Sequence, residues 1–161
     1  MPTAGRTDPQ IMKEGLKFHD LPDMDGNVGK MEAMYLKFLE HEINNPLRHL
    51  KPGIKEALSL LNEMDMVIGL LTGNLEKGAD IKLNAFGLND YFLDGAFGSD
   101  DEDRDKLLPI AIGKFAQRGF EFAPEDCIVV GDTPRDVQCA KIHGAHCIAV
   151  ATGPYSKESL L

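Results

Sequence analysis

The chain has 161 residues, enough for one domain with a hydrophobic core, or for one core with a small appendage. Hydrophobic residues make up 43% and charged residues 27%, and no stretch approaches the roughly 18 consecutive apolar residues that a membrane span needs. The formal net charge of -9 repels the phosphates of nucleic acids. We therefore expect neither a membrane nor a nucleic acid as a partner.

The three cysteines give no sign of a structural cross-link or a zinc site. Cys127, Cys139 and Cys147 are odd in number and contain no CxxC pair. The N-terminus lacks the pattern of a signal peptide, and the C-terminus carries no lipidation or retention signal. These features predict a reducing, cytoplasmic location.

The first 50 residues carry only helical patterns separated by polar breaks. Apolar residues recur at helical spacing over 11–16 and again over 29–40. A different pattern begins at Lys51-Pro52-Gly53, where an amphipathic helix follows. We expect a helical segment over residues 1–50 and an α/β core over residues 51–161.

In the second segment, short apolar runs alternate with helical patterns. The run 66–71 is typical of a buried parallel strand. The alternation continues with a helix over 78–86, a strand over 95–98, a helix over 106–117, a strand over 127–130, a helix over 135–143 and a strand over 147–150. This order predicts a doubly wound, Rossmann-like parallel sheet with helices on both faces.

Polar residues follow the predicted strands at the end where parallel α/β sheets bind ligands. Thr72, Gly73 and Asn74 offer a hydroxyl and backbone N–H groups that suit an anion such as phosphate, although the same tripeptide is a common turn. Asp132 and Asp136 are two hard oxygen ligands at a spacing that suits Mg²⁺. Asp136 alone has an alternative role, because a carboxylate also stabilises a helix N-terminus.

Two cations stand at the head of the predicted helix over 106–117. Arg104 and Lys106 lie where the helix dipole disfavours positive charge, so an anion nearby would explain them. The acidic residues of the segment 100–105 offer the alternative that both cations form surface ion pairs.

The order of these motifs resembles the haloacid dehalogenase (HAD) superfamily of phosphohydrolases, in particular its phosphoglycolate phosphatase-like members with a helical cap. The similarity rests on Leu71-Thr72-Gly73-Asn74, a following basic residue, and Gly131-Asp132-Thr133-Pro134-Arg135-Asp136. It implies that residues 1–50 are a partial helical cap and that residues 51–161 are a HAD-like α/β core.

The resemblance also implies an activity, namely Mg²⁺-dependent hydrolysis of a small phosphorylated metabolite through a phosphoaspartyl intermediate. Thr72, with the backbone of Gly73 and Asn74, would bind the transferring phosphoryl group. Arg104 or Lys106 would neutralise its charge, and Arg104 is favoured because its sequence context resembles one subgroup.

The two aspartates of the last motif take the metal role in this comparison. Asp132 would ligate Mg²⁺, and Asp136 would support the ion directly or through water. Such a division is reasonable, because phosphoryl transfer depends mainly on positioning and charge stabilisation.

The family's first motif, an apolar strand running into Asp-x-Asp-Gly-Thr, is missing before the cap-like segment. Asp23-Met24-Asp25-Gly26 has the right letters, with Asp23 as nucleophile, but follows a polar stretch and reads as an ordinary turn. We therefore expect a fragment whose core lacks its first strand. Two unpaired inner edges would remain, on the strand ending at Thr72 and on the strand ending before Asp132.

Two alternatives to a phosphatase stay open at the level of sequence. One is a catalytically inactive HAD-like fragment, or a phosphate- or metal-binding module that keeps the pocket without a nucleophile. The other is a receiver-like signalling domain, which also uses strand-end aspartates and Mg²⁺.

Overall fold

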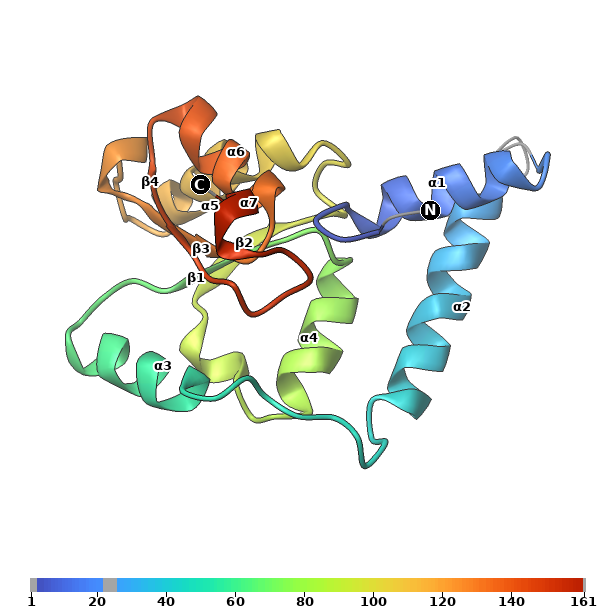
Figure 1. Ribbon diagram of the computed structural model, residues 1–161, viewed down its shortest axis with the longest axis horizontal. Coiled ribbons are helices and arrows are strands. Elements are labelled where there is room, and N and C mark those ends of the chain that lie inside the picture. Colours follow the sequence, from blue (N-terminus) through green and yellow to red (C-terminus); the bar gives the residue numbers. More distant parts are fainter. Residues whose placement is uncertain (1–2, 22–25, 161) are drawn as a thin grey trace.

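The computed structural model describes residues 3–21 and 26–160 (Figure 1). The α-helices in these ranges are α1 (Asp8–Phe18), α2 (Asn27–Glu42), α3 (Ile54–Glu63), α4 (Glu76–Asn84), α5 (Leu107–Gln117), α6 (Pro134–His143) and α7 (Lys157–Leu160). The strands are β1 (Gly69–Thr72), β2 (Asp94–Phe97), β3 (Ile128–Gly131) and β4 (His146–Ala149). Short 3-10 helices η2 (Asn89–Tyr91), η3 (Arg104–Lys106) and η4 (Pro124–Asp126) connect them. None of these helices is both long and apolar enough to cross a membrane.

The strands form two separate parallel pairs. β1 pairs with β2, placing Leu71 opposite Ala96, and β3 pairs with β4, placing Val129 opposite Cys147. The predicted parallel α/β arrangement is confirmed, but the continuous sheet is not found, because no ladder joins β1 to β3 within the described residues. The break lies between the two strands whose inner edges the sequence led us to expect unpaired.

Helices α5 and α6 build the core against one face of these strands. α5 packs on β1 and β2, and α6 packs on β3 and β4. The buried residues form two clusters, one of Ala96, Leu107 and Ala111 and the other of Leu108, Val129, Cys139 and Ala140. Leu71 of β1 packs against both clusters, so it links the two strand pairs through α5.

The opposite face of β3 and β4 is open, which corrects the expectation of helices on both faces. Side chains alternate between the two faces of a strand, so burying Val129 turns its neighbours the other way. Ile128, Val130 and Ile148 are 53%, 64% and 52% exposed. An apolar surface therefore extends over this part of the described structure.

The N-terminal helices lie to one side of the strands (Figure 1). α1 begins at an N-cap, where Thr7 accepts a hydrogen bond from the Gln10 backbone, and it buries Met12 and Leu16. α1 packs on α2, and α2 packs on α4 of the core. The division of the chain near residue 50 remains a prediction.

Candidate active site

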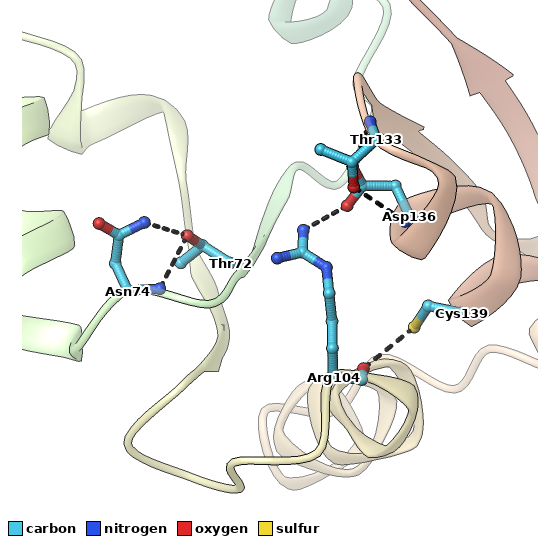
Figure 2. Close-up of polar contacts among 6 residues, drawn as sticks. All are labelled: Thr72, Asn74, Arg104, Thr133, Asp136 and Cys139. Carbon is cyan, nitrogen blue, oxygen red and sulfur yellow. Dashed lines mark hydrogen bonds and ion pairs between the residues drawn. The ribbon is translucent and has the colours of Figure 1, made fainter. Parts of the chain in front are cut away.

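The loop after β1 is organised around the hydroxyl of Thr72. The backbone N–H of Asn74 donates to Thr72 Oγ1 at 3.2 Å, and the side-chain amide of Asn74 donates to the same oxygen at 2.7 Å (Figure 2). Lys82 of α4 donates in turn to Asn74 Oδ1. The sequence predicted a binding loop at Thr72, Gly73 and Asn74, and these three residues form one ordered turn.

Arg104 reaches the site from η3, after β2. Its guanidinium forms an ion pair with Asp136, and the two side chains are only 11% and 5% exposed. In Figure 2 the guanidinium points towards Asp136, with Thr72 and Asn74 on its other side. The Arg104 carbonyl accepts a hydrogen bond from the Cys139 thiol at 3.3 Å, which fixes the start of η3 against α6.

Lys106, the other candidate cation, faces away from this pair. Its side chain is 60% exposed and forms an ion pair with Asp101 at 3.1 Å. The hydrogen bond and the charge of Asp101 raise the pKa of Lys106. The structure thus brings Arg104 to Asp136 and leaves Lys106 in the surface pairing that its acidic neighbours suggested.

The loop between β3 and α6 is held by Asp136. One oxygen of its carboxylate accepts hydrogen bonds from the Thr133 backbone N–H at 3.0 Å and from the Thr133 hydroxyl at 2.8 Å. The other oxygen takes Arg104. Asp136 therefore caps α6 and anchors the arginine at the same time. The helix-terminus role expected from the sequence accounts for the cap, whereas the metal role of Asp136 stays a prediction.

Asp132 differs from Asp136 in having a free carboxylate. It is half-buried and lies against Gly153, where an added Cβ atom would overlap the carboxylate. No hydrogen bond or ion pair engages Asp132 within the described residues. An oxygen ligand without a protein partner, beside a glycine that leaves it room, fits a divalent cation.

The same ranges contain no group of three or more His, Cys, Asp or Glu side chains placed to hold a metal. Mg²⁺ needs only one or two carboxylates and takes its other ligands from water and substrate phosphate. Asp132 satisfies that requirement, and Asp136 supports the loop that carries it.

Sequence reasoning missed the segment Gly5–Asp8. Its Arg6 forms an ion pair with Glu14 of α1. The Asp8 backbone N–H donates to the Gly73 carbonyl at 2.6 Å, and the Asp8 carboxylate accepts the Leu75 N–H at 2.9 Å. The segment therefore caps the entry to α4 and packs against the loop that follows β1.

The segment also contacts elements from elsewhere in the core. Thr7 is fully buried and donates to the Glu102 carbonyl at 2.8 Å. A Cβ atom added to Gly5 would come within 2.7 Å of Thr133 Oγ1. One short stretch of chain thus bridges both strand pairs. The absence of side chains at Gly5, Gly73 and Gly98 is the signal that could have indicated this close approach.

The candidate nucleophile Asp23 lies outside the described residues. The candidate site residues that the structure describes are Thr72 at the end of β1, Asn74 after it, Arg104 of η3, Asp132 after β3 and Asp136 in the first turn of α6.

A family model described as haloacid dehalogenase-like hydrolase matches residues 9–150. The chain therefore belongs to this family of hydrolases and phosphatases. That membership does not support the receiver-like alternative.

Individual relatives agree with the family match. The phosphoglycolate phosphatase of Vibrio vulnificus is 29% identical over 112 residues, which are 70% of this chain and 48% of that protein. The chain spans about half the length of the curated relatives it matches. The sequence is thus distantly related to phosphoglycolate phosphatases.

Solved structures share the fold. A predicted phosphoglycolate phosphatase from Haemophilus somnus matches with a TM-score of 0.70 at 18% identity, covering 93% of this chain and 67% of that one. A hydrolase from Pseudomonas syringae matches with a TM-score of 0.71 at 19% identity, covering 98% and 70%. At these identities the likeness concerns the fold alone.

Proposed function

We propose that this chain provides the phosphate- and metal-binding part of a Mg²⁺-dependent phosphohydrolase that acts on a small phosphorylated metabolite in the cytoplasm. The observation that carries the proposal is the buried Arg104–Asp136 pair beside the ordered Thr72 loop. A buried cation held in place at strand ends, next to a hydroxyl donor, is suited to a phosphoryl group.

Each residue has a distinct task in this proposal. Thr72 donates its hydroxyl proton to a phosphoryl oxygen, while the backbone of Gly73 and Asn74 shapes the loop. Arg104 offsets negative charge on the phosphoryl group, and Asp136 holds the guanidinium in position. Lys106 has no part in the site, because its ammonium faces Asp101.

Asp132 would hold the metal. Bound Mg²⁺ would supply positive charge that stabilises the phosphoryl oxygens during transfer. Asp136 would contribute through the loop, since both of its oxygens already accept hydrogen bonds or an ion pair.

Phosphoryl transfer through a phosphoaspartyl intermediate further requires an aspartate nucleophile. Asp23 is the candidate nucleophile that the sequence offers. The second candidate is a carboxylate on a strand that would insert between β1 and β3. Because curated relatives of this chain are phosphoglycolate phosphatases, 2-phosphoglycolate is the first substrate to test.

A non-catalytic phosphate-binding module is the second candidate function. It is favoured by the separation of the two strand pairs, because no strand within the described ranges lies between β1 and β3 to present a nucleophile. Such a module would bind phosphate through Thr72 and Arg104 without hydrolysing a phosphate ester.

Phosphate release from 2-phosphoglycolate and p-nitrophenyl phosphate with Mg²⁺, measured together with inorganic phosphate binding by calorimetry, separates these functions. A phosphatase predicts turnover that Asp132→Asn abolishes, and loss of turnover in Asp23→Asn would identify the nucleophile. Binding without turnover would favour the module. Neither binding nor turnover by folded, monodisperse protein would refute both.

A further inference from the structure

Three residues form a hydrogen-bonded chain that ends at the phosphate-binding hydroxyl. Lys82 of α4 donates to Asn74 Oδ1, and Asn74 donates twice to Thr72 Oγ1, from its backbone and from its side chain. The last two links are drawn in Figure 2. The chain connects a cation on a core helix to the group that would touch the substrate.

The first link fixes the orientation of the Asn74 amide. A lysine ammonium has only donors, so it must face the amide oxygen. The amide nitrogen is then turned towards Thr72, at 2.7 Å from its hydroxyl oxygen. Without Lys82, the opposite orientation of the amide would place an oxygen against Thr72 and compete for the hydroxyl proton.

The second link fixes the direction of the Thr72 proton. A hydroxyl can accept two hydrogen bonds and donate one. Both accepting positions of Thr72 are taken by Asn74, so the O–H bond is left to point away from the loop. That arrangement prepares a donor for an incoming anion.

The positive charge of Lys82 is directed mainly at the Asn74 amide oxygen. The side chain is half-buried between α4 and α2, with the ammonium 5.9 Å from the centre of the Tyr35 ring. Within the described residues, no carboxylate forms an ion pair with it. Hydrogen bonds from a charged donor are about twice as strong as neutral ones, so the Lys82–Asn74 bond is a firm anchor.

We propose that Lys82 is a positioning residue which, through the Asn74 amide, directs the Thr72 hydroxyl proton at the phosphoryl group. The proposal rests on the phosphoryl site proposed at Thr72. Lys82 does not contact the phosphoryl group itself, and its effect passes through Thr72.

Inorganic phosphate, titrated calorimetrically into the full chain, tests the proposal through a double-mutant cycle. We expect Lys82→Met to weaken phosphate affinity roughly 3- to 10-fold, as for the loss of one hydrogen bond. Asn74→Asp removes the amide donor and should act in the same direction, whereas Lys82→Arg should keep most of the affinity. Lys77→Met removes an equal charge from an exposed position on the same helix and should have little effect.

The decisive comparison is made in a Thr72→Val background. If Lys82 acts through the hydroxyl, Lys82→Met weakens binding no further there, and thermal unfolding confirms that the variants are folded. Equal losses in both backgrounds would overturn the proposal, because Lys82 would then attract the anion directly. Unchanged binding in Lys82→Met would overturn it while leaving the phosphate site intact, whereas failure of the wild-type chain to bind phosphate would overturn both.

Discussion

The buried ion pair between Arg104 and Asp136 allows a sharp test of the site. Replacing Arg104 with Met keeps an unbranched, largely aliphatic side chain but removes the guanidinium. It therefore leaves the Asp136 carboxylate, whose side chain is 5% exposed in the intact pair, without its cation. Breaking a buried pair in this way costs about 3 to 5 kcal/mol, because the remaining charge stays desolvated. The hydrogen bonds from Thr133 reduce the loss towards the lower figure, since they still satisfy one oxygen.

Urea denaturation of Arg104→Met measures this cost, and Lys106→Met is the matched control two residues away on η3. The Lys106 ammonium is exposed and pairs with Asp101 at the surface, so its replacement should leave the unfolding free energy unchanged within error. Phosphate affinity should fall in Arg104→Met alone. Equal effects of the two substitutions would refute the assignment of Arg104 as the buried cation of the site.

Three further predictions test other parts of the structure. Gly73→Ala places a Cβ atom 2.9 Å from the Thr7 Cα and should lower the free energy of unfolding by about 1 to 3 kcal/mol. Gly113→Ala, at an exposed helical position, should instead raise it by about 0.5 to 1 kcal/mol. Equal stability of the two variants in urea would contradict the close approach at Gly73. Burial raises the pKa of Asp94, but the Gly95 N–H and the Arg118 guanidinium outweigh it, and the pKa lies below its ordinary 3.8. The destabilisation by Arg118→Met, followed by thermal unfolding, should therefore be present above about pH 4 and vanish as pH falls through the lowered value, and a constant difference would speak against the pair. Burial raises the pKa of all three cysteine thiols, but only Cys139 is fully buried, whereas Cys127 and Cys147 are partly exposed. Iodoacetamide should therefore label Cys127 and Cys147 in the native protein and Cys139 only after unfolding, and native labelling of Cys139 would disprove its burial.

The alternation of strands and helices could be predicted because each apolar run is short and bounded by turn residues. The start of β1 could not be predicted in this way. The sequence run begins at Met66, yet the strand begins at Gly69, after Asp65 adopts a positive φ of 55° and leaves Met66 48% exposed. A run of apolar residues indicates a strand, but it does not show which of these residues pair with a neighbouring strand and become buried.

The candidate site was predictable where a motif lies on a single loop. Arg104 and Lys106 could not be separated by spacing, because their different directions depend on η3, where two residues span most of a turn. Lys82 belongs to no motif, since it reaches Asn74 from the far end of α4. The contact between Gly5 and Thr133 joins residues that are far apart in the sequence, so the glycine could indicate a close approach without identifying its partner.

The bridge formed by Gly5–Asp8 has a consequence for the order of folding. Each strand pair with its intervening helix is built from near neighbours in sequence, so each can form early and on its own. The bond from Thr7 to Glu102 joins residues 95 apart, and closing a loop of that length costs more entropy than closing the short loops within each strand pair. The elements around Thr72 and Asp136 therefore gain their final spacing last, and hydrogen exchange should show the Asp8 amide opening before those of β1 and β3.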